Sequence, residues 1–187
     1  SCAETLSKVI NPEVGETWFV LADGGAAIWL QREEEEPDFE VLQSFYATDG
    51  QLVDMYTTPG KLPPHQEALD KGGYFLFGDG TRLREEALRR YLFMLERLFP
   101  GGRGLERISW LIPHQVNRGL IDEVCQRSGL EARRVWSAER FGNLGGTSVV
   151  FSLAEAWEQR LFSPGDELLL MSVGGGLSFA MQHWVMR

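Results

Sequence analysis

The stretch Trp110-Leu-Ile-Pro-His-Gln-Val-Asn117 places a histidine at the end of an apolar run. The run breaks off at a proline, and a helical pattern begins directly after it. An imidazole is therefore expected at the C-terminal tip of a buried strand, where open α/β sheets bind ligands. A second stretch, Glu139-Arg-Phe-Gly-Asn-Leu-Gly-Gly-Thr-Ser148, puts Asn143 in a loop before another helix. His114 and Asn143 are thus candidate site residues.

Length and composition narrow the classes of protein. The chain has 187 residues, and its formal net charge of −9 argues against a nucleic-acid partner. Two cysteines give neither a disulfide framework nor a metal-ligand pattern, so no metal is expected. No apolar segment approaches the roughly 18 residues of a membrane span, and no signal-peptide pattern opens the sequence. We expect a cytoplasmic protein with no membrane partner, and the acidic block Glu33–Glu36 as a solvated loop.

Hydrophobic periodicity predicts alternating strands and helices. Helices are expected at 81–98, 116–129 and 146–162. Strands are expected at 17–22, 26–30, 39–47, 108–112, 134–136, 167–173 and 177–186. The turn signal Asp23-Gly24-Gly25 predicts a hairpin or a bent strand pair formed by the first two strands. The proline- and glycine-rich stretch 48–80 is too long for a simple connection and is expected to be a functional excursion or cover.

This order indicates an α/β fold with helices on both faces of a mostly parallel sheet. Right-handed crossovers place the strand-to-helix loops on one edge of such a sheet. His114 and Asn143 are therefore expected to face the same side. The run Gly174-Gly175-Gly176 follows the most apolar strand, and its backbone could approach a ligand closely.

Four motifs, in order, resemble the C-terminal half of a type III ketoacyl-acyl-carrier-protein synthase of the thiolase superfamily. They are Leu21–Ala27, Pro113–Asn117, Phe141–Asn143 with Thr147-Ser148, and Gly174–Ser178. The resemblance spans nearly the whole chain. It implies one thiolase-like C-terminal domain over residues 1–187, with a layered α/β/α architecture and a mixed five-stranded sheet, which is one half of a duplicated fold.

The resemblance also implies chemistry. His114 and Asn143 would belong to a Cys-His-Asn triad and would assist the decarboxylative condensation of an acyl thioester with a malonyl thioester. Both carry N–H donors that can be aimed at a developing oxyanion, and the backbone of Gly174, Gly175 and Gly176 could add to that site. No cofactor is implied, because the substrates are acyl-coenzyme A or acyl-carrier-protein thioesters.

The nucleophile is the part that this chain is expected to lack. In the family it lies upstream of the Leu21–Ala27 motif, so the resemblance implies an N-terminal half that carries the Cys as a partner, and a homodimer of the full protein. Cys2 is too close to that motif, and Cys125 falls on the apolar stripe of a helix. Ser172 stands where degradative thiolases carry a second Cys, which argues against the thiolase reaction.

Three functions stay open on these grounds. The first is decarboxylative condensation, the second is acyl transfer to an alcohol or amine, and the third is a non-catalytic synthase-like partner subunit. The acyl carrier is open too. The family commonly docks an acidic carrier protein through an Arg two residues after the Asn of the His-containing motif, whereas this chain has Gly119 there and Arg118 one place earlier.

Overall fold

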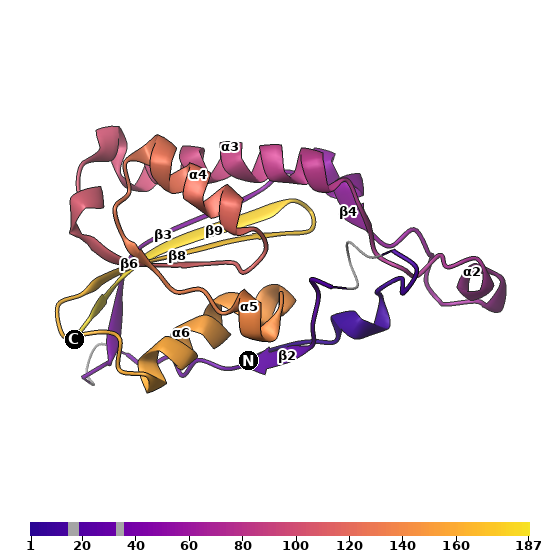
Figure 1. The fold of residues 1–187 in the computed structure, drawn as a ribbon, viewed down its shortest axis with the longest axis horizontal. Helices are drawn as coiled ribbons and strands as arrows, with labels where there is room; N and C mark the ends of the chain where they lie inside the picture. Colours follow the sequence, from indigo (N-terminus) through magenta and orange to yellow (C-terminus); the bar gives the residue numbers. More distant parts are fainter. Residues whose placement is uncertain (15–18, 33–35) are drawn as a thin grey trace.

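A mixed five-stranded sheet forms the centre of the fold in the computed structural model, which describes residues 1–14, 19–32 and 36–187. In spatial order its strands are β3 (Phe39–Thr48), β9 (Ser178–Met186), β8 (Glu167–Gly174), β6 (Ile108–Pro113) and β7 (Arg133–Arg134) (Figure 1). Strand β6 is parallel to both β8 and β7, whereas β9 is antiparallel to both β8 and β3. The mixed five-stranded sheet is the one that the resemblance implied, but the mostly parallel sheet expected from the order of elements is wrong, because two of the four pairings in this sheet are antiparallel.

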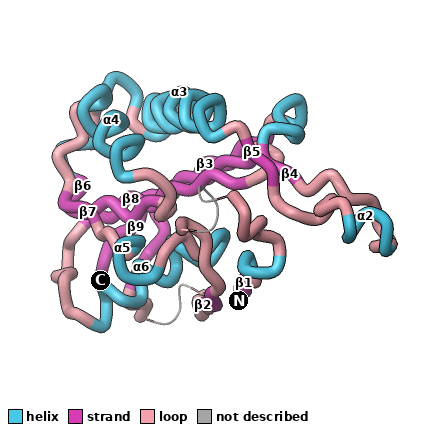
Figure 2. The backbone as a smooth tube through the Cα atoms, turned by 45° about the vertical axis from the view of Figure 1, so that its right-hand side comes forward, coloured by secondary structure: helices cyan, strands magenta, loops and turns pink. Residues whose placement is uncertain are grey.

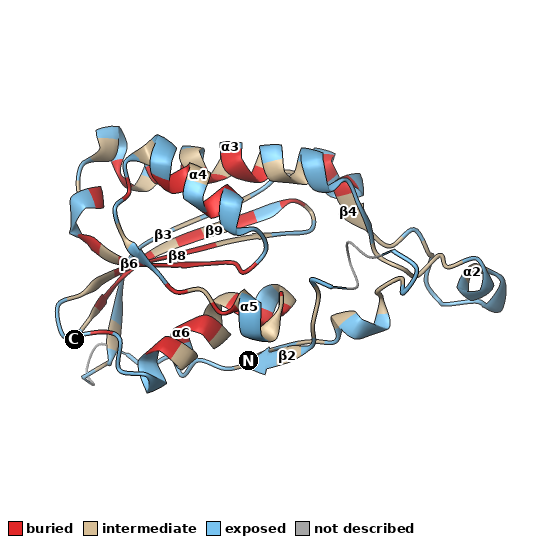
Figure 3. Cartoon of the chain, viewed as in Figure 1, coloured by how far each residue is buried: buried red, intermediate tan, exposed pale blue. Residues whose placement is uncertain are grey.

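The centre of strand β8, Leu168–Met171, is apolar at every position because both faces of the sheet are covered there. Leu169 and Met171 belong to the apolar core on one face, and Leu168 and Leu170 to the core on the other. This alternation is the period of two that a strand imposes on its side chains. Figure 3 shows the buried residues along these strands and the inner sides of the helices.

Two helices cover the first face. Helix α3 (Gly80–Leu98) begins at Asp79, whose side chain accepts a hydrogen bond from the Arg82 backbone N–H at 3.0 Å. Helix α4 (Arg118–Ser128) begins at Asn117, whose Oδ1 accepts the Leu120 N–H at 2.9 Å. Such caps satisfy amide groups that the first turn of a helix cannot pair. Both helices were predicted to within two residues.

The second face is covered by shorter elements. They are α5 (Ala138–Phe141), the 3-10 turn η5 (Gly145–Thr147) and α6 (Ser148–Glu158). Leu153 and Ala156 of α6 pack in one core with Trp110 and Ile112 of β6. Figure 2 shows the sheet between α3 with α4 and α5 with α6. The fold is therefore the predicted layered α/β/α arrangement, in which β7 and α6 are shorter than expected.

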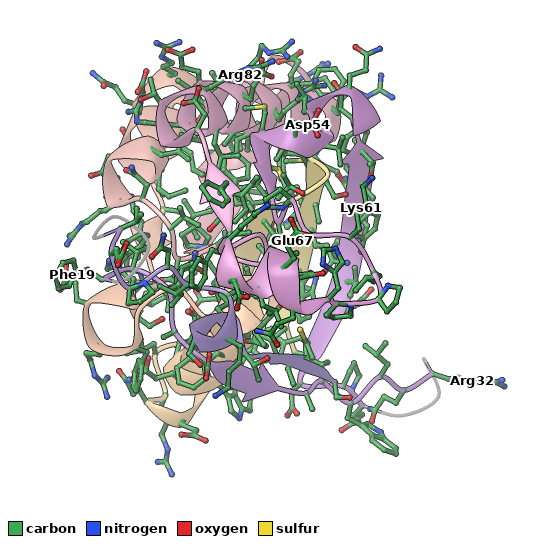
Figure 4. The ribbon with its side chains drawn as sticks, turned by 90° about the vertical axis from the view of Figure 1, so that its right-hand side faces the viewer. Phe19, Arg32, Asp54, Lys61, Glu67 and Arg82 are labelled. Atoms are coloured by element: carbon green, nitrogen blue, oxygen red, sulfur yellow. The ribbon has the colours of Figure 1, made fainter. Side chains whose placement is uncertain are left out.

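The predicted N-terminal hairpin or bent strand pair is wrong. Residues 17–18 lie outside the described part of the chain, Phe19 and Val20 form a turn, and the segment after Ala26 forms no strand. Instead β2 (Gly24–Ala26) pairs antiparallel with β1 (Cys2–Glu4). An apolar run becomes a strand only where another strand pairs with it, and here Phe19 and Trp29 are each 84% exposed. Figure 4 shows Phe19 projecting from the body.

The stretch 48–80 carries short elements of its own. Strands β4 (Tyr56–Thr57) and β5 (Phe77–Gly78) pair with each other, and between them the chain extends away from the body to α2 (Gln66–Asp70) (Figure 1). Its role as a cover stays a prediction, as does the single domain over residues 1–187. The remaining elements are 3-10 turns, namely η1 (Leu6–Lys8), η2 (Gly50–Met55), η3 (Pro100–Gly102) and η4 (Leu105–Arg107).

Two sequence expectations concern the outside of the fold. None of the helices that the structure describes has the length and apolar character needed to cross a membrane. The solvated loop expected at the acidic block Glu33–Glu36 falls mostly on residues 33–35, which lie outside the described part of the chain.

Candidate functional site

His114 continues the last strand pairing of β6. Its backbone N–H donates to the carbonyl of Met171 in β8 at 2.7 Å, so the alternation of β6 extends one residue past the strand. Trp110 and Ile112 face α6, and His114 has the same parity, which places it on the face of the sheet that carries α5, η5 and α6. The imidazole is therefore at the strand tip where the sequence predicted it.

The His114 ring is buried and electrically neutral near pH 7. Burial lowers its pKa to about 4, because a charged imidazolium would lose its hydration. Its Nδ1 is buried, and no described residue forms a hydrogen bond with it. A buried polar atom without a partner is uncommon in a native fold and calls for an explanation such as a ligand.

Asn143 is held by backbone and side chain together. Its N–H donates to the Val20 carbonyl at 2.7 Å, and its carbonyl accepts from the Ala22 N–H at 2.9 Å. Its side-chain Oδ1 accepts from the Gly145 N–H at 2.9 Å and from the Ser148 hydroxyl at 3.3 Å. Because a backbone N–H can only donate, the oxygen must face Gly145, and the two Nδ2 hydrogens are left for another acceptor.

The same strand end receives both residues. His114 bonds to Met171 of β8, and η5, which begins two residues after Asn143, contacts β8 as well. The predicted glycine run forms the turn from β8 to β9 at this edge, where Gly174 pairs with Ser178. A Cβ on Gly174 would meet nothing within 4 Å, whereas Gly176 has a φ of 133° that favours glycine. Space is therefore left beside Gly174 at this edge of the sheet.

The motif at Leu21–Ala27 lies against the Asn143 loop. A Cβ on Gly24 would stand 3.0 Å from Thr147 Oγ1 and 3.1 Å from Leu144 Cβ, and one on Gly142 would stand 3.0 Å from the Val20 carbonyl. These two glycines therefore let the Leu21–Ala27 segment and the Asn143 loop lie close against each other.

One buried residue at the site went unrecognised in the sequence. Gln115 is 1% exposed, and its side-chain amide spans the end of β6 and the residues that lead into α5. In the sequence, only the motif Pro113–Asn117, which contains Gln115, marked this position. Three of its four partners are backbone groups 20 to 23 residues away, and periodicity carries no signal for such bonds.

One of the two cysteines, Cys125, has the position that the sequence predicted. Cys125 is buried in the core on the inner stripe of α4. Cys2 is a half-buried free thiol in β1 that lies beside Gly146. Within residues 1–14, 19–32 and 36–187, no group of three or more His, Cys, Asp or Glu side chains is placed to hold a metal ion.

Comparison with protein-family models decides the family. The C-terminal model of 3-oxoacyl-[acyl-carrier-protein] synthase III matches residues 101–186, and a second model of the same synthase matches residues 1–50. The chain belongs to the 3-oxoacyl-acyl-carrier-protein synthase III family. Both halves of the candidate site, around His114 and Asn143, lie within the first match.

Individual synthase III relatives agree with this assignment. The beta-ketoacyl-[acyl-carrier-protein] synthase III of Chlamydia caviae is 29% identical over 183 residues, which are 95% of this chain and 54% of the relative. That of Desulfitobacterium hafniense is 31% identical over 191 residues, 98% of this chain and 57% of the relative. The chain therefore spans about half the length of the relatives that it matches.

Solved structures support the synthase III fold. The synthase of Pseudomonas aeruginosa superposes with a TM-score of 0.78 at 22% identity, over 98% of this chain and 56% of that one. The synthase of Thermus thermophilus gives a TM-score of 0.74 at 26% identity, over 99% of this chain and 57% of that one. The predicted thiolase-like fold is confirmed.

Proposed function

We propose that this chain is the histidine- and asparagine-bearing part of a 3-oxoacyl-acyl-carrier-protein synthase III-type acyltransferase. In this proposal it assists the decarboxylative condensation of an acyl thioester with a malonyl thioester. The observation that carries the proposal is the pairing of donors at one sheet edge. His114 is buried and neutral with an unpartnered nitrogen, and Asn143 has its oxygen occupied and its amide hydrogens left over.

The chemistry uses these donors at one step. Loss of carbon dioxide breaks a carbon–carbon bond of the malonyl thioester and leaves its electron pair on an enolate. Neutral N–H groups of His114 and Asn143 would hydrogen-bond the enolate oxygen, and backbone groups of Gly174–Gly176 would line the same edge. The enolate carbon then attacks the acyl thioester, a carbon–carbon bond forms, and a thiolate leaves.

The thiolate would come from a Cys outside these residues. Cys125 is enclosed in the core, and Cys2 lies in a strand beside Gly146, not at the N-terminus of a helix that would activate a thiol. We propose that a thiolase-like N-terminal half supplies the nucleophile and covers the exposed apolar segment around Phe19, Trp29 and Leu30. A homodimer of the full protein follows from the same family pattern.

The acyl donor is a thioester, either of coenzyme A or of an acyl carrier protein. Arg118, next to the position from which the family docks its carrier, forms an ion pair with Glu139 at 2.9 Å. That pair uses part of the positive charge that an acidic carrier would seek, so coenzyme A thioesters are the first substrates to test.

The test uses the protein with its Cys-bearing half present, in one chain or as two associated chains. Radiolabelled acyl-coenzyme A should label the protein, and malonyl-coenzyme A should release carbon dioxide. His114→Ala or Asn143→Ala should lower carbon dioxide release by about 100- to 1000-fold, the usual effect of removing one oxyanion donor. The isolated 187 residues should show no turnover.

Other outcomes select among the alternatives. Acyl labelling without carbon dioxide release, with label passing to an alcohol or amine, would identify simple acyl transfer. Absence of labelling and of decarboxylation would make the chain a non-catalytic partner subunit. Either result would overturn the condensation proposal.

A further inference from the structure

Gln115 connects the two halves of the candidate site through its side-chain amide. Its Nε2 donates to the carbonyl of Pro113 at 2.8 Å and to that of Val135 at 3.2 Å. Its Oε1 accepts from the N–H of Ser137 at 2.8 Å and of Ala138 at 3.2 Å. These bonds use both hydrogens and both lone pairs of the amide, so no hydrogen-bonding capacity is left unused.

One partner of Gln115 directly precedes His114 in the chain, and the other three lie five to eight residues before Asn143. Pro113 carries the peptide group that enters His114. Ser137 and Ala138 form the first turn of α5, a four-residue helix that leads through Gly142 to Asn143. A buried side chain therefore joins the end of β6 to the start of the segment that ends at Asn143.

Helix α5 depends on Gln115 for its N-terminal cap. Ser137 is the N-cap residue, but its hydroxyl makes no capping bond and is paired instead with the Ser152 hydroxyl at 2.7 Å. The first amides of a helix need an acceptor, and Gln115 Oε1 provides it from another element. The position of α5 thus follows the position of the β6 tip.

We propose that Gln115 is a positioning residue, which sets the separation and mutual orientation of His114 and Asn143. The inference rests on the proposed function. It goes further by assigning to Gln115 a control of the step in which both donors act together. A misplacement of about 1 Å at a reacting centre can cost roughly 100-fold in rate.

The decisive variants are Gln115→Met and Gln115→Glu in the protein with its Cys-bearing half. Gln115→Met keeps the length of the side chain and removes all four bonds. It should lower the turnover number for malonyl decarboxylation by about 10- to 100-fold with the KM nearly unchanged. Labelling by acyl-coenzyme A should change less than about threefold, because that step depends on the Cys.

Gln115→Glu supplies a signature that general instability would not give. Its carboxylate keeps an acceptor for Ser137 and Ala138 but turns a second oxygen toward two carbonyls. Protonation restores one donor, so the decarboxylation rate relative to wild type should rise as the pH falls from about 8.5 to 6. Gln115→Met should show no such rise. A flat ratio for Gln115→Glu would contradict the inference.

A control and a second readout separate this inference from the proposed function. Leu130→Ala empties a buried core position beyond the C-terminal end of α4 and should leave decarboxylation unchanged. In the 187-residue chain, the NMR signals of the His114 ring and of the Asn143 amide should both shift in Gln115→Met. Neither signal should shift in Leu130→Ala.

The outcomes are distinguishable. Wild-type protein without decarboxylation would remove the proposed function, whereas the NMR shifts would still report the coupling. Wild-type activity that His114→Ala abolishes and Gln115→Met leaves within twofold would overturn the role of Gln115 alone.

Discussion

At the residue scale, the buried neutral ring of His114 makes stability depend on pH. Its pKa is about 4 in the folded protein and roughly 6.5 in an unfolded chain. The unfolded state therefore binds a proton first as the pH falls, and folding stability is lost between pH 6.5 and 4. The expected loss from this ring at pH 5, relative to pH 8, is about 2 kcal/mol.

Denaturant unfolding of the 187-residue chain at both pH values checks this prediction. His114→Gln should reduce the pH dependence by that amount, because its amide does not titrate. Asn143→Ala, which alters the same site but keeps the ring, should retain the wild-type difference. Equal pH dependence in His114→Gln and wild type would show that the ring is not the source.

Ser148 is the second residue whose contacts predict an effect. Its hydroxyl accepts the Leu144 N–H at 3.0 Å and donates to Asn143 Oδ1. Ser148→Ala should free the Asn143 amide to rotate and lower the decarboxylation turnover number by roughly tenfold, with a stability cost of about 1 kcal/mol. Ser128→Ala, which removes a hydroxyl bond to the Val124 carbonyl at the far end of α4, is the matched control and should leave the rate unchanged.

At the element scale, the Asn143 loop and β2 fit together without spare room. Gly24→Ala would place a methyl group within 3.2 Å of Leu144 and Thr147, both of them buried. Gly25→Ala, one residue on, would meet only the Cys2 carbonyl at 3.8 Å. We expect Gly24→Ala to cost about 1–3 kcal/mol in thermal or denaturant unfolding and Gly25→Ala clearly less. Equal costs would mean that the contact relaxes freely.

The elements that the sequence predicted correctly are those whose own side chains determine them. Helix α3 has an apolar stripe and a terminating Pro100-Gly101-Gly102, and β8 has an unbroken apolar centre, Leu168–Met171, because it is buried on both faces there. The apolar runs at 17–22 and 26–30 carry an equally strong strand pattern. They fail as a hairpin because strand formation depends on a partner, and a pattern does not state whether that partner is present.

The site was predictable to a similar depth. Strand-end logic placed His114 and Asn143 at one edge of the sheet, since loops after parallel strands gather there. The bonds that fix their orientation, from Gln115 and Ser148, were not predictable. They depend on the distance between backbone groups in the folded chain, which no local spacing encodes.

At the scale of the whole molecule, the exposed N-terminal segment predicts self-association of the isolated chain. Trp29 is 84% and Leu30 81% exposed, and the two are adjacent in the sequence. Phe19, also 84% exposed, projects from the body as well (Figure 4). Large apolar side chains exposed in this way on a monomer favour an interaction surface. Light scattering should show concentration-dependent growth in mass for the 187-residue chain.

The double variant Trp29→Gln, Leu30→Gln tests this surface. It should reduce the self-association, because less apolar surface would be buried when two copies meet. Leu62→Gln is the matched control, since Leu62 is 85% exposed but lies on the excursion toward α2, outside this N-terminal segment. It should leave the association unchanged.

Addition of a Cys-bearing N-terminal half should compete with self-association, because both would cover the same side chains. A chain that stays monomeric at all concentrations would show that these apolar side chains need no partner.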